Sequence, residues 1–146
     1  MNAGKSFEQD FKNSVPETTL FLRLPDGGGW SNAENTRFTP SNLCDCILFT
    51  HGILYLLELK SHLGKSIPMS AMKQLPKLAE IQKQAVRPCL VLNYRDYNLT
   101  YLLTAQRATE CLQTRKSIPI SWCEEYGKVI PQTLKRTHYK YNLEIL

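Results

Sequence analysis

Three charged residues interrupt two apolar stretches of this sequence, where charge is unusual. Asp45 lies within residues 42–49 (NLCDCILF), and Glu58 and Lys60 lie near the end of residues 53–60 (ILYLLELK). A buried charge is costly unless it is paired or binds a metal ion. Two carboxylates and a lysine, brought together, are the groups of a divalent-metal site that hydrolyses phosphodiester bonds.

The two apolar stretches predict a β-hairpin with a turn at His51 and Gly52. A turn there pairs residues whose numbers sum to about 103, which places Asp45 opposite Glu58. Alternation along a strand puts Glu58 and Lys60 on one face. Since two opposed carboxylates repel each other, we expect Mg²⁺ between them, and Lys60 would stabilise charge on phosphorus or orient the attacking water.

A structural interpretation remains open for the same residues. Asp45 or Glu58 would then form an ordinary ion pair with Lys60 at the end of a strand. Glu8 is a third candidate ligand, because it lies beside the apolar stripe of a helix expected over residues 5–14. It would reach the metal if that helix packs beside the sheet; otherwise it is a solvated glutamate.

The order of expected elements predicts a single α/β domain over residues 1–146, with a central mixed sheet of about five strands flanked by helices. A glycine-rich loop covers 25–41, and a basic, aromatic tail covers 134–146. The other expected elements are a strand at 18–24, a brief helical turn at Ser70, a helix from Pro76 to about Ala85, strands at 88–94 and 99–103, helices at 105–113 and 121–127, and a last strand at 139–145.

Composition narrows the class of protein further. The chain has 146 residues and a net charge of +5, which suits a polyanionic partner. The longest apolar run is too short to cross a bilayer, and residues 1–5 lack the apolar region of a signal peptide, so a cytoplasmic location is expected. The five cysteines are expected to be reduced and buried. Cys44 and Cys46 lack the further partners that a zinc site requires.

Several residues outside the hairpin are candidates for DNA contact. Cations of the tail would bind phosphates without choosing a sequence, and side chains of the long loop would stack on unpaired bases. A solvated tail and a loop anchored to the core are the alternatives. Gly64-Lys65-Ser66 lacks the preceding glycine of a phosphate-binding loop, so no nucleotide cofactor is expected. The candidate DNA contacts are Trp30, Arg37, Lys65, Gln74, Lys135, Arg136 and Lys140.

Five blocks of sequence, in order, resemble the phage-borne RecU-type Holliday-junction resolvases of the PD-(D/E)XK nuclease superfamily. The likeness runs over about residues 4–104, with a fainter trace at 116–120 (KSIPI). The blocks are 4–8 (GKSFE), 14–16 (SVP), 37–45 (RFTPSNLCD), 56–61 (LLELKS) and 64–68 (GKSIP).

The resemblance implies a restriction-endonuclease-like core in which Glu8, Asp45 and Glu58 bind Mg²⁺, with Mn²⁺ as a substitute, and Glu58 and Lys60 form the active-site pair. It also implies a homodimer that cuts symmetrically across a four-way DNA junction, in the host cytoplasm if the protein is phage-encoded. Residues 27–39 occupy the place of the stalk that enters the junction in bacterial members. Many relatives carry a glutamine near the position of Pro76, for which Gln74 is the candidate substitute.

Two other functions remain open on the sequence. One is a different nuclease of the same superfamily that trims flaps or nicks duplex DNA. The other is a non-catalytic DNA-binding module that has kept a vestigial site.

Overall fold

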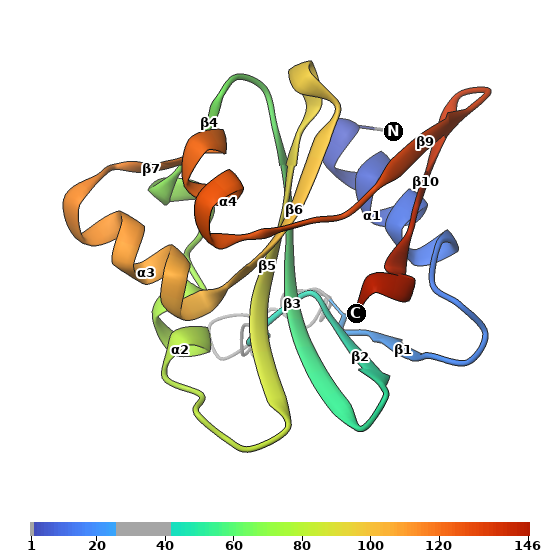
Figure 1. The fold of residues 1–146 in the computed structure, drawn as a ribbon, viewed down its shortest axis with the longest axis horizontal. Helices are drawn as coiled ribbons and strands as arrows, with labels where there is room; N and C mark the ends of the chain where they lie inside the picture. Colours follow the sequence, from blue (N-terminus) through green and yellow to red (C-terminus); the bar gives the residue numbers. More distant parts are fainter. Residues whose placement is uncertain (1, 26–41) are drawn as a thin grey trace, which may run out of the picture.

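A six-stranded mixed sheet forms the centre of the computed structural model, which describes residues 2–25 and 42–146. Its strand order is β1-β2-β3-β5-β6-β8, and β3 and β5 are parallel while the other neighbouring pairs are antiparallel (Figure 1). The expected mixed sheet is therefore confirmed, with β8 as the strand that the sequence analysis missed. The strands are β1 (Leu20–Arg23), β2 (Cys46–Thr50), β3 (Ile53–His62), β5 (Val86–Tyr94), β6 (Leu99–Thr104) and β8 (Lys128–Val129).

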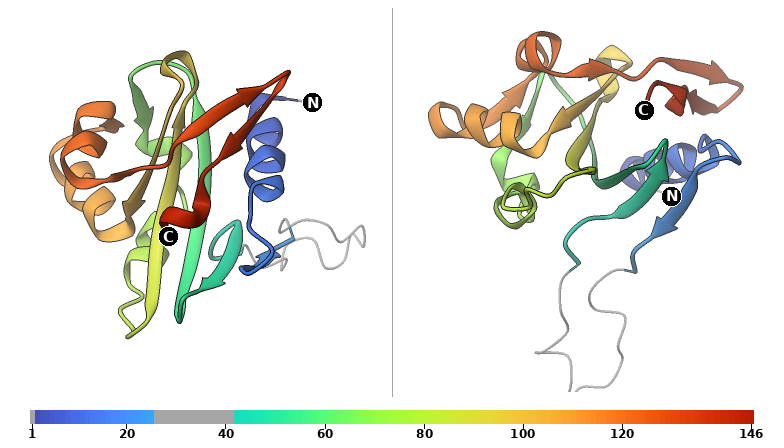
Figure 2. Two further views of the ribbon diagram at one scale, coloured as in Figure 1. Left: turned by 45° about the vertical axis from the view of Figure 1, so that its right-hand side comes forward. Right: turned by 60° about the horizontal axis from the view of Figure 1, so that its bottom comes forward.

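Helices cover both faces of this sheet (Figures 1 and 2). Helix α1 (Ala3–Asn13) lies on one face, and α2 (Leu75–Ala79), α3 (Ala105–Thr114) and α4 (Ile120–Tyr126) lie on the other. Strands β3 and β5 are apolar on both sides because each face has its own buried cluster: Leu57, Leu59 and Val91 under α1, and Leu56, Leu90 and Leu92 towards α2 and α3. None of the helices in the two described ranges is long and apolar enough to cross a membrane.

The β2–β3 hairpin has the register that the sequence predicts. Cys46 pairs with Leu57 and Thr50 with Ile53. His51 and Gly52 form the two-residue turn with φ of 52° and 75°, and positive φ at both central positions is typical of the tight turn that matches strand twist. This hairpin brings Asp45, just before β2, towards Glu58 in β3.

Helix α1 begins and ends near the expected residues. The side chain of Asn2 accepts the Lys5 backbone N–H at 2.8 Å, which caps the N-terminus. Phe7 and Phe11 are buried against the sheet and contact Tyr141. The opposite side of α1 is exposed and polar, and Glu8 lies between this exposed side and the buried one.

The C-terminal segment differs from the expected tail. It forms a second hairpin, β9 (Gln132–Lys135) and β10 (His138–Tyr141), which packs on α1, and it ends in a 3₁₀ turn, η4 (Leu143–Ile145) (Figure 2). The strand expected at 139–145 is therefore wrong in extent, and β9 was not predicted. The turn is made by Arg136, with φ of 60°, and it lacks the glycine or asparagine that normally signals a hairpin.

The segment between β3 and β5 also departs from the prediction. The helix expected from Pro76 to about Ala85 ends at Ala79. Ala85 itself is not helical, because it has φ of 61° and its carbonyl accepts the Leu54 N–H where the chain enters β5. The helical turn expected at Ser70 is present as η2 (Met69–Ala71).

Two copies of the tetrapeptide Lys-Ser-Ile-Pro pair with each other. Strand β4 (Ser66–Pro68) is antiparallel to β7 (Ser117–Pro119), with Ile67 opposite Ile118 and both fully buried. This small sheet ties the loop after β3 to α3 and α4. A last 3₁₀ turn, η3 (Arg95–Tyr97), connects β5 to β6.

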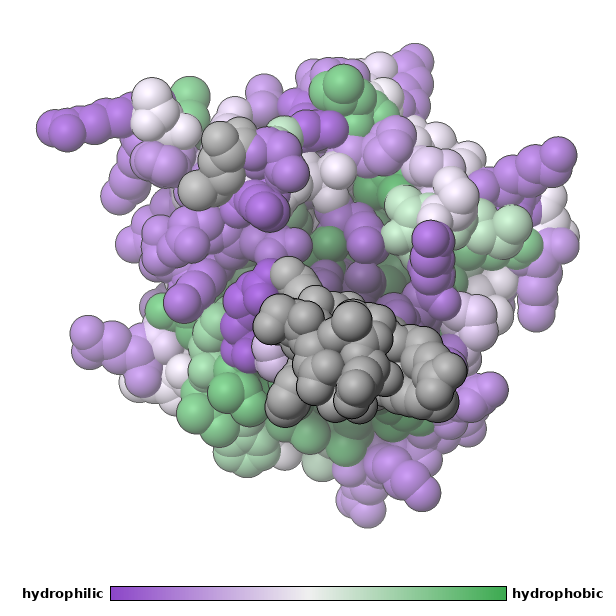
Figure 3. All heavy atoms as spheres, turned by 180° about the vertical axis from the view of Figure 1, so that it is seen from behind, coloured by the Kyte–Doolittle hydropathy of each residue, from purple (hydrophilic) through white to green (hydrophobic). Residues whose placement is uncertain are grey.

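The face seen in Figure 3 is mostly hydrophilic, and its apolar residues form several patches. One of these patches lies towards the lower end of this view from behind, and others lie at the top and on the right. The exposed large apolar side chains include Leu20 and Leu22 of the edge strand β1 and Phe49 of β2, and Leu20 lies directly opposite Phe49.

Candidate active site

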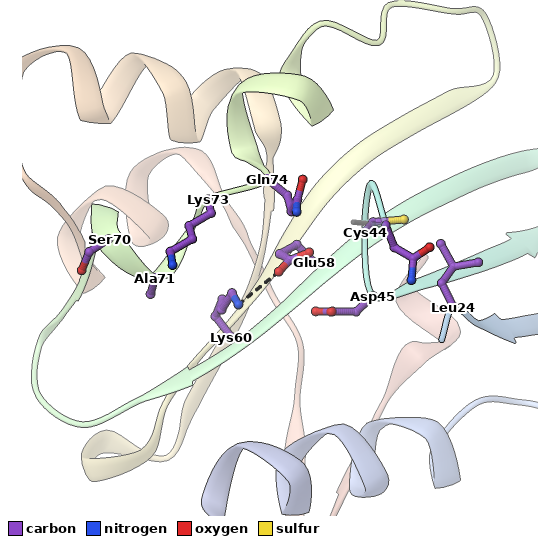
Figure 4. A pocket seen from close by; sticks show the side chains of 10 residues that line it. Leu24, Cys44, Asp45, Glu58, Lys60, Ser70, Ala71, Lys73 and Gln74 are labelled. Atoms are coloured by element: carbon purple, nitrogen blue, oxygen red, sulfur yellow. Dashed lines mark ion pairs between the residues drawn. The ribbon is translucent and has the colours of Figure 1, made fainter. Parts of the chain in front are cut away.

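The two carboxylates of the predicted site line one cavity of about 330 Å³ beside the central strand β3. Asp45, Glu58 and Lys60 come from the β2–β3 hairpin, and Lys73 and Gln74 come from the segment that leads into α2 (Figure 4). Asn42 and Cys44 complete the side nearest to β2. The hairpin and α2 together therefore bring acidic, basic and amide groups to one hollow.

Asp45 is fixed by its backbone and by its side chain. Its N–H donates to the Leu57 carbonyl at 2.9 Å, although Leu57 is also the partner of Cys46. Two residues opposite one are the mark of a β-bulge, a feature that redirects side chains. The Asp45 Oδ2 then accepts the Leu59 N–H at 2.7 Å, and its carbonyl accepts the Leu24 N–H at 2.9 Å. These bonds hold the carboxylate at the wall of the cavity.

Glu58 is 5% exposed and forms an ion pair with Lys60, with 3.1 Å between Oε1 and Nζ. This contact is the one that the structural interpretation of the sequence expects. Lys60 keeps 30% of its side chain exposed, and it lines the same cavity as Asp45. The lysine of the pair is therefore not enclosed in the core.

Burial alters the acidity of both carboxyl groups. Desolvation, followed by the negative charge of Asp45, raises the pKa of Glu58, against the opposing effect of Lys60. Desolvation also raises the pKa of Asp45, while the Leu59 N–H and the charge of Lys60 act in the opposite direction. Perturbed carboxyl groups in a hollow are typical of functional sites.

Glu8 reaches the neighbourhood of these acids from α1. Its negative charge contributes to the raised pKa of both Asp45 and Glu58. It lines a second cavity, of about 340 Å³, which also includes Asp45, and its Oε2 lies 3.0 Å from Arg23 in an ion pair. Asp45 is thus a wall shared by two cavities, one on each side of it.

Metal binding fits the two carboxylates that share the first cavity. Asp45 and Glu58 offer the oxygen donors that Mg²⁺ prefers, and Mg²⁺ commonly uses one or two protein carboxylates together with waters and phosphates. Within residues 2–25 and 42–146, no three His, Cys, Asp or Glu side chains are grouped to hold one ion. Direct ligation by Glu8 therefore stays a prediction.

Two buried cysteines, Cys44 and Cys46, flank Asp45 in the sequence. All five cysteines of the chain are free and buried, as expected. Burial raises the pKa of the Cys44 thiol to about 11 and raises that of Cys46 as well. Both are therefore neutral thiols near pH 7.

The structure separates the candidate DNA contacts. Gln74 lines the cavity of Asp45 and Glu58. Lys65 is exposed before β4, and Lys135 and Arg136 are exposed on the C-terminal hairpin, outside both cavities that Asp45 lines. Lys140 lines a different cavity, next to the end of α1. Trp30, Arg37 and the stalk equivalent at 27–39 lie outside the described residues.

The sequence analysis missed other polar residues that line the two cavities. Lys73 and Asn42 lie in the first, and Lys5, Gln9 and Lys12 lie in the second. One signal was present for the second group, since Lys5, Gln9 and Lys12 recur at helical spacing beside Glu8. The only sequence signal for Lys73 was its position next to Gln74.

Comparison with known proteins relates the chain to a prophage-derived protein. No family model matches the chain. The chain is similar to the SPβ prophage-derived uncharacterised protein YotM of Bacillus subtilis strain 168, with 28% identity over 166 aligned positions that cover 99% of this chain and 85% of that protein. Fold and site together define a mixed α/β protein with a hollow beside its central strand that is lined by two carboxylates and two lysines.

Proposed function

We propose that this protein is a metal-dependent DNA endonuclease with a restriction-endonuclease-like core. One observation carries the proposal: Asp45, held by a bulge and by the Leu59 N–H, shares a hollow with the buried Glu58 and with Lys60. An acid pair beside a lysine on a central strand is an arrangement suited to phosphodiester hydrolysis.

Each residue has a role that follows from its position. Asp45 and Glu58 would hold Mg²⁺ or Mn²⁺, and an ion bound there would supply Lewis acidity and a water of lowered pKa. Lys60, whose side chain is partly exposed in the cavity, donates to a phosphate oxygen or places the attacking water. Glu8 adds negative charge near the site and is the candidate third ligand.

The proposed substrate is a four-way DNA junction, cut by a homodimer in the cytoplasm. The order of the resolvase-like sequence blocks and the net charge of +5 support this substrate. Because symmetric cutting requires two active sites, a dimer with one site in each chain is the simplest assembly. Flap trimming or duplex nicking by the same site is the nearest alternative.

One observation favours a non-catalytic DNA-binding module instead. The Glu58–Lys60 ion pair satisfies both charges without any metal, as a vestigial site would. Mn²⁺ titration separates the two functions, since a vestigial site would bind no metal and would lose nothing on Glu58→Gln.

The deciding assay compares four-way, flap and linear DNA at equal concentration with Mg²⁺. We expect paired symmetric nicks on the four-way junction and little cutting of the others. Asp45→Asn is the matched control, because the amide oxygen can still accept the Leu59 N–H. We expect it to lower cleavage at least about 100-fold and to keep junction binding, since one repulsive charge is removed. Full cleavage by this variant would refute the assignment.

A further inference from the structure

The second cavity contains cations for which the proposed chemistry has no role. Lys5, Gln9 and Lys12 line it from the exposed face of α1, together with Arg23 from β1. Their spacing of four and three residues places them along one side of the helix. Asp45 forms the wall between this row and the acidic hollow.

The two lysines of this row have no counterion in the described part of the chain. No ion pair or side-chain hydrogen bond joins Lys5 or Lys12 to any residue in those ranges, whereas Glu8 on the same helix is paired with Arg23 at 3.0 Å. Lys5 also lies in the first turn of α1, which has no acidic residue. Its charge adds to the partial positive charge of the helix N-terminus, which is unfavourable for the helix itself. Because Lys5 is unfavourable at the N-terminus of the helix and has no ion-pair partner in the described residues, its position points to a ligand outside the chain.

Cations also lie on the other side of the acids. Lys73 is exposed and lines the first cavity beside Lys60 and Gln74 (Figure 4). The acidic residues Asp45 and Glu58 are therefore flanked by lysines in both directions. This arrangement suits a polyanionic strand that crosses the acids, with phosphates on either side of the one that is cut.

We infer that the α1 cavity binds the backbone of the DNA strand next to the scissile phosphate, through Lys5 and Lys12. Seven residues of an α-helix rise about 10.5 Å, so Lys5 and Lys12 are far enough apart to contact different phosphates of one strand. The inference rests on the proposed nuclease function for the identity of the ligand, and it assigns strand binding to α1 rather than to the C-terminal hairpin.

The test measures binding of a labelled four-way junction over a series of salt concentrations, with the full-length Asp45→Asn protein. Each lost phosphate contact reduces the slope of log K against log salt by about 0.9. The double variant K5A/K12A is expected to reduce the slope by about 1.8. The matched control K77A/K83A removes the same charge from exposed sites outside both cavities, and it should keep the original slope.

Two results would overturn the inference: an unchanged slope for K5A/K12A, or equal losses in the two double variants, which would indicate only a net-charge effect. If the slope of log K against log salt falls in K135A/K140A but not in K5A/K12A, the DNA strand binds the C-terminal hairpin instead of α1. Circular dichroism melting shows that each variant is folded. Cleavage by the wild-type protein is measured in parallel. If K5A/K12A alone loses slope but the wild-type protein cuts no DNA, the DNA-binding role of α1 stands and the nuclease function is refuted. If the wild-type protein cuts DNA but K5A/K12A keeps the original slope, the nuclease function stands and the role of α1 is refuted.

Discussion

The buried carboxylate of Glu58 lowers the stability of the folded protein when it is ionised. Glu58 is 5% exposed, and its pKa is raised because burial and the charge of Asp45 outweigh the effect of Lys60. A carboxyl group whose pKa is higher in the folded state disfavours folding once it is ionised. The cost is fully present above the folded pKa and disappears as the pH falls below the unfolded one.

Replacement of this carboxylate is therefore expected to stabilise the metal-free protein. Glu58→Gln should raise the Tm by a few degrees near pH 7, since about 1 kcal/mol moves the Tm of a domain of this size by roughly 2–4 °C. The gain should shrink as the pH falls from the raised pKa of Glu58 in the folded state to its usual value in the unfolded state, and it should be absent below that value. Thermal melts of both proteins in chelator, over a pH series, measure this. A variant less stable than the wild type at every pH would show that the Lys60 ion pair dominates.

At the scale of elements, the hairpin that carries the acids was predictable and its surroundings were not. The apolar runs and the His51-Gly52 turn determine the register, which locates Asp45 near Glu58 from sequence alone. The bulge at Asp45 depends on pairing with Leu57 and on the bond from Leu24 of the edge strand, and these tertiary contacts leave no local pattern.

The cations around the acids were missed for a related reason. Whether Lys12 or Lys73 faces the acids depends on how α1 and α2 dock on the sheet. Phe7 and Phe11 mark the buried side of α1, but the sequence does not say which strand they cover. The turn of the C-terminal hairpin has no glycine, so the sequence did not predict the hairpin. Its packing on α1 could therefore not be predicted either.

The bond between this hairpin and α1 provides a test of how α1 is held. Asp10 is 5% exposed and accepts both the Tyr139 N–H at 3.0 Å and His138 Nδ1 at 2.9 Å. Asp10→Ala leaves the Tyr139 donor unsatisfied, so we expect a loss of about 1–3 kcal/mol in the free energy of unfolding, measured in urea. The exposed Glu17 serves as control, and Glu17→Ala should stay within about 0.5 kcal/mol. Equal effects of the two substitutions would mean that the hydrogen bonds of Asp10 to His138 and Tyr139 do not stabilise the fold.

At the scale of the whole molecule, the proposed reaction asks for more than one chain. The described residues hold one hollow with the acid pair and lysine, whereas symmetric resolution of a junction needs two cuts. A chain of 16.8 kDa should therefore run at twice that mass in light scattering if the assembly is a dimer. Mass alone does not show that both sites act together on one junction.

Mixing active and inactive chains tests that cooperation directly. When wild-type and Asp45→Asn chains are mixed equally and allowed to exchange, about a quarter of two-fold dimers carry two active sites. Resolution by paired nicks should then fall to about a quarter of the wild-type rate, because each strand needs its own acid pair. Mixed dimers should instead accumulate junctions nicked on one strand, visible on denaturing gels. Resolution that falls only to half would indicate that each chain cuts independently, and it would remove the reason to invoke a dimer.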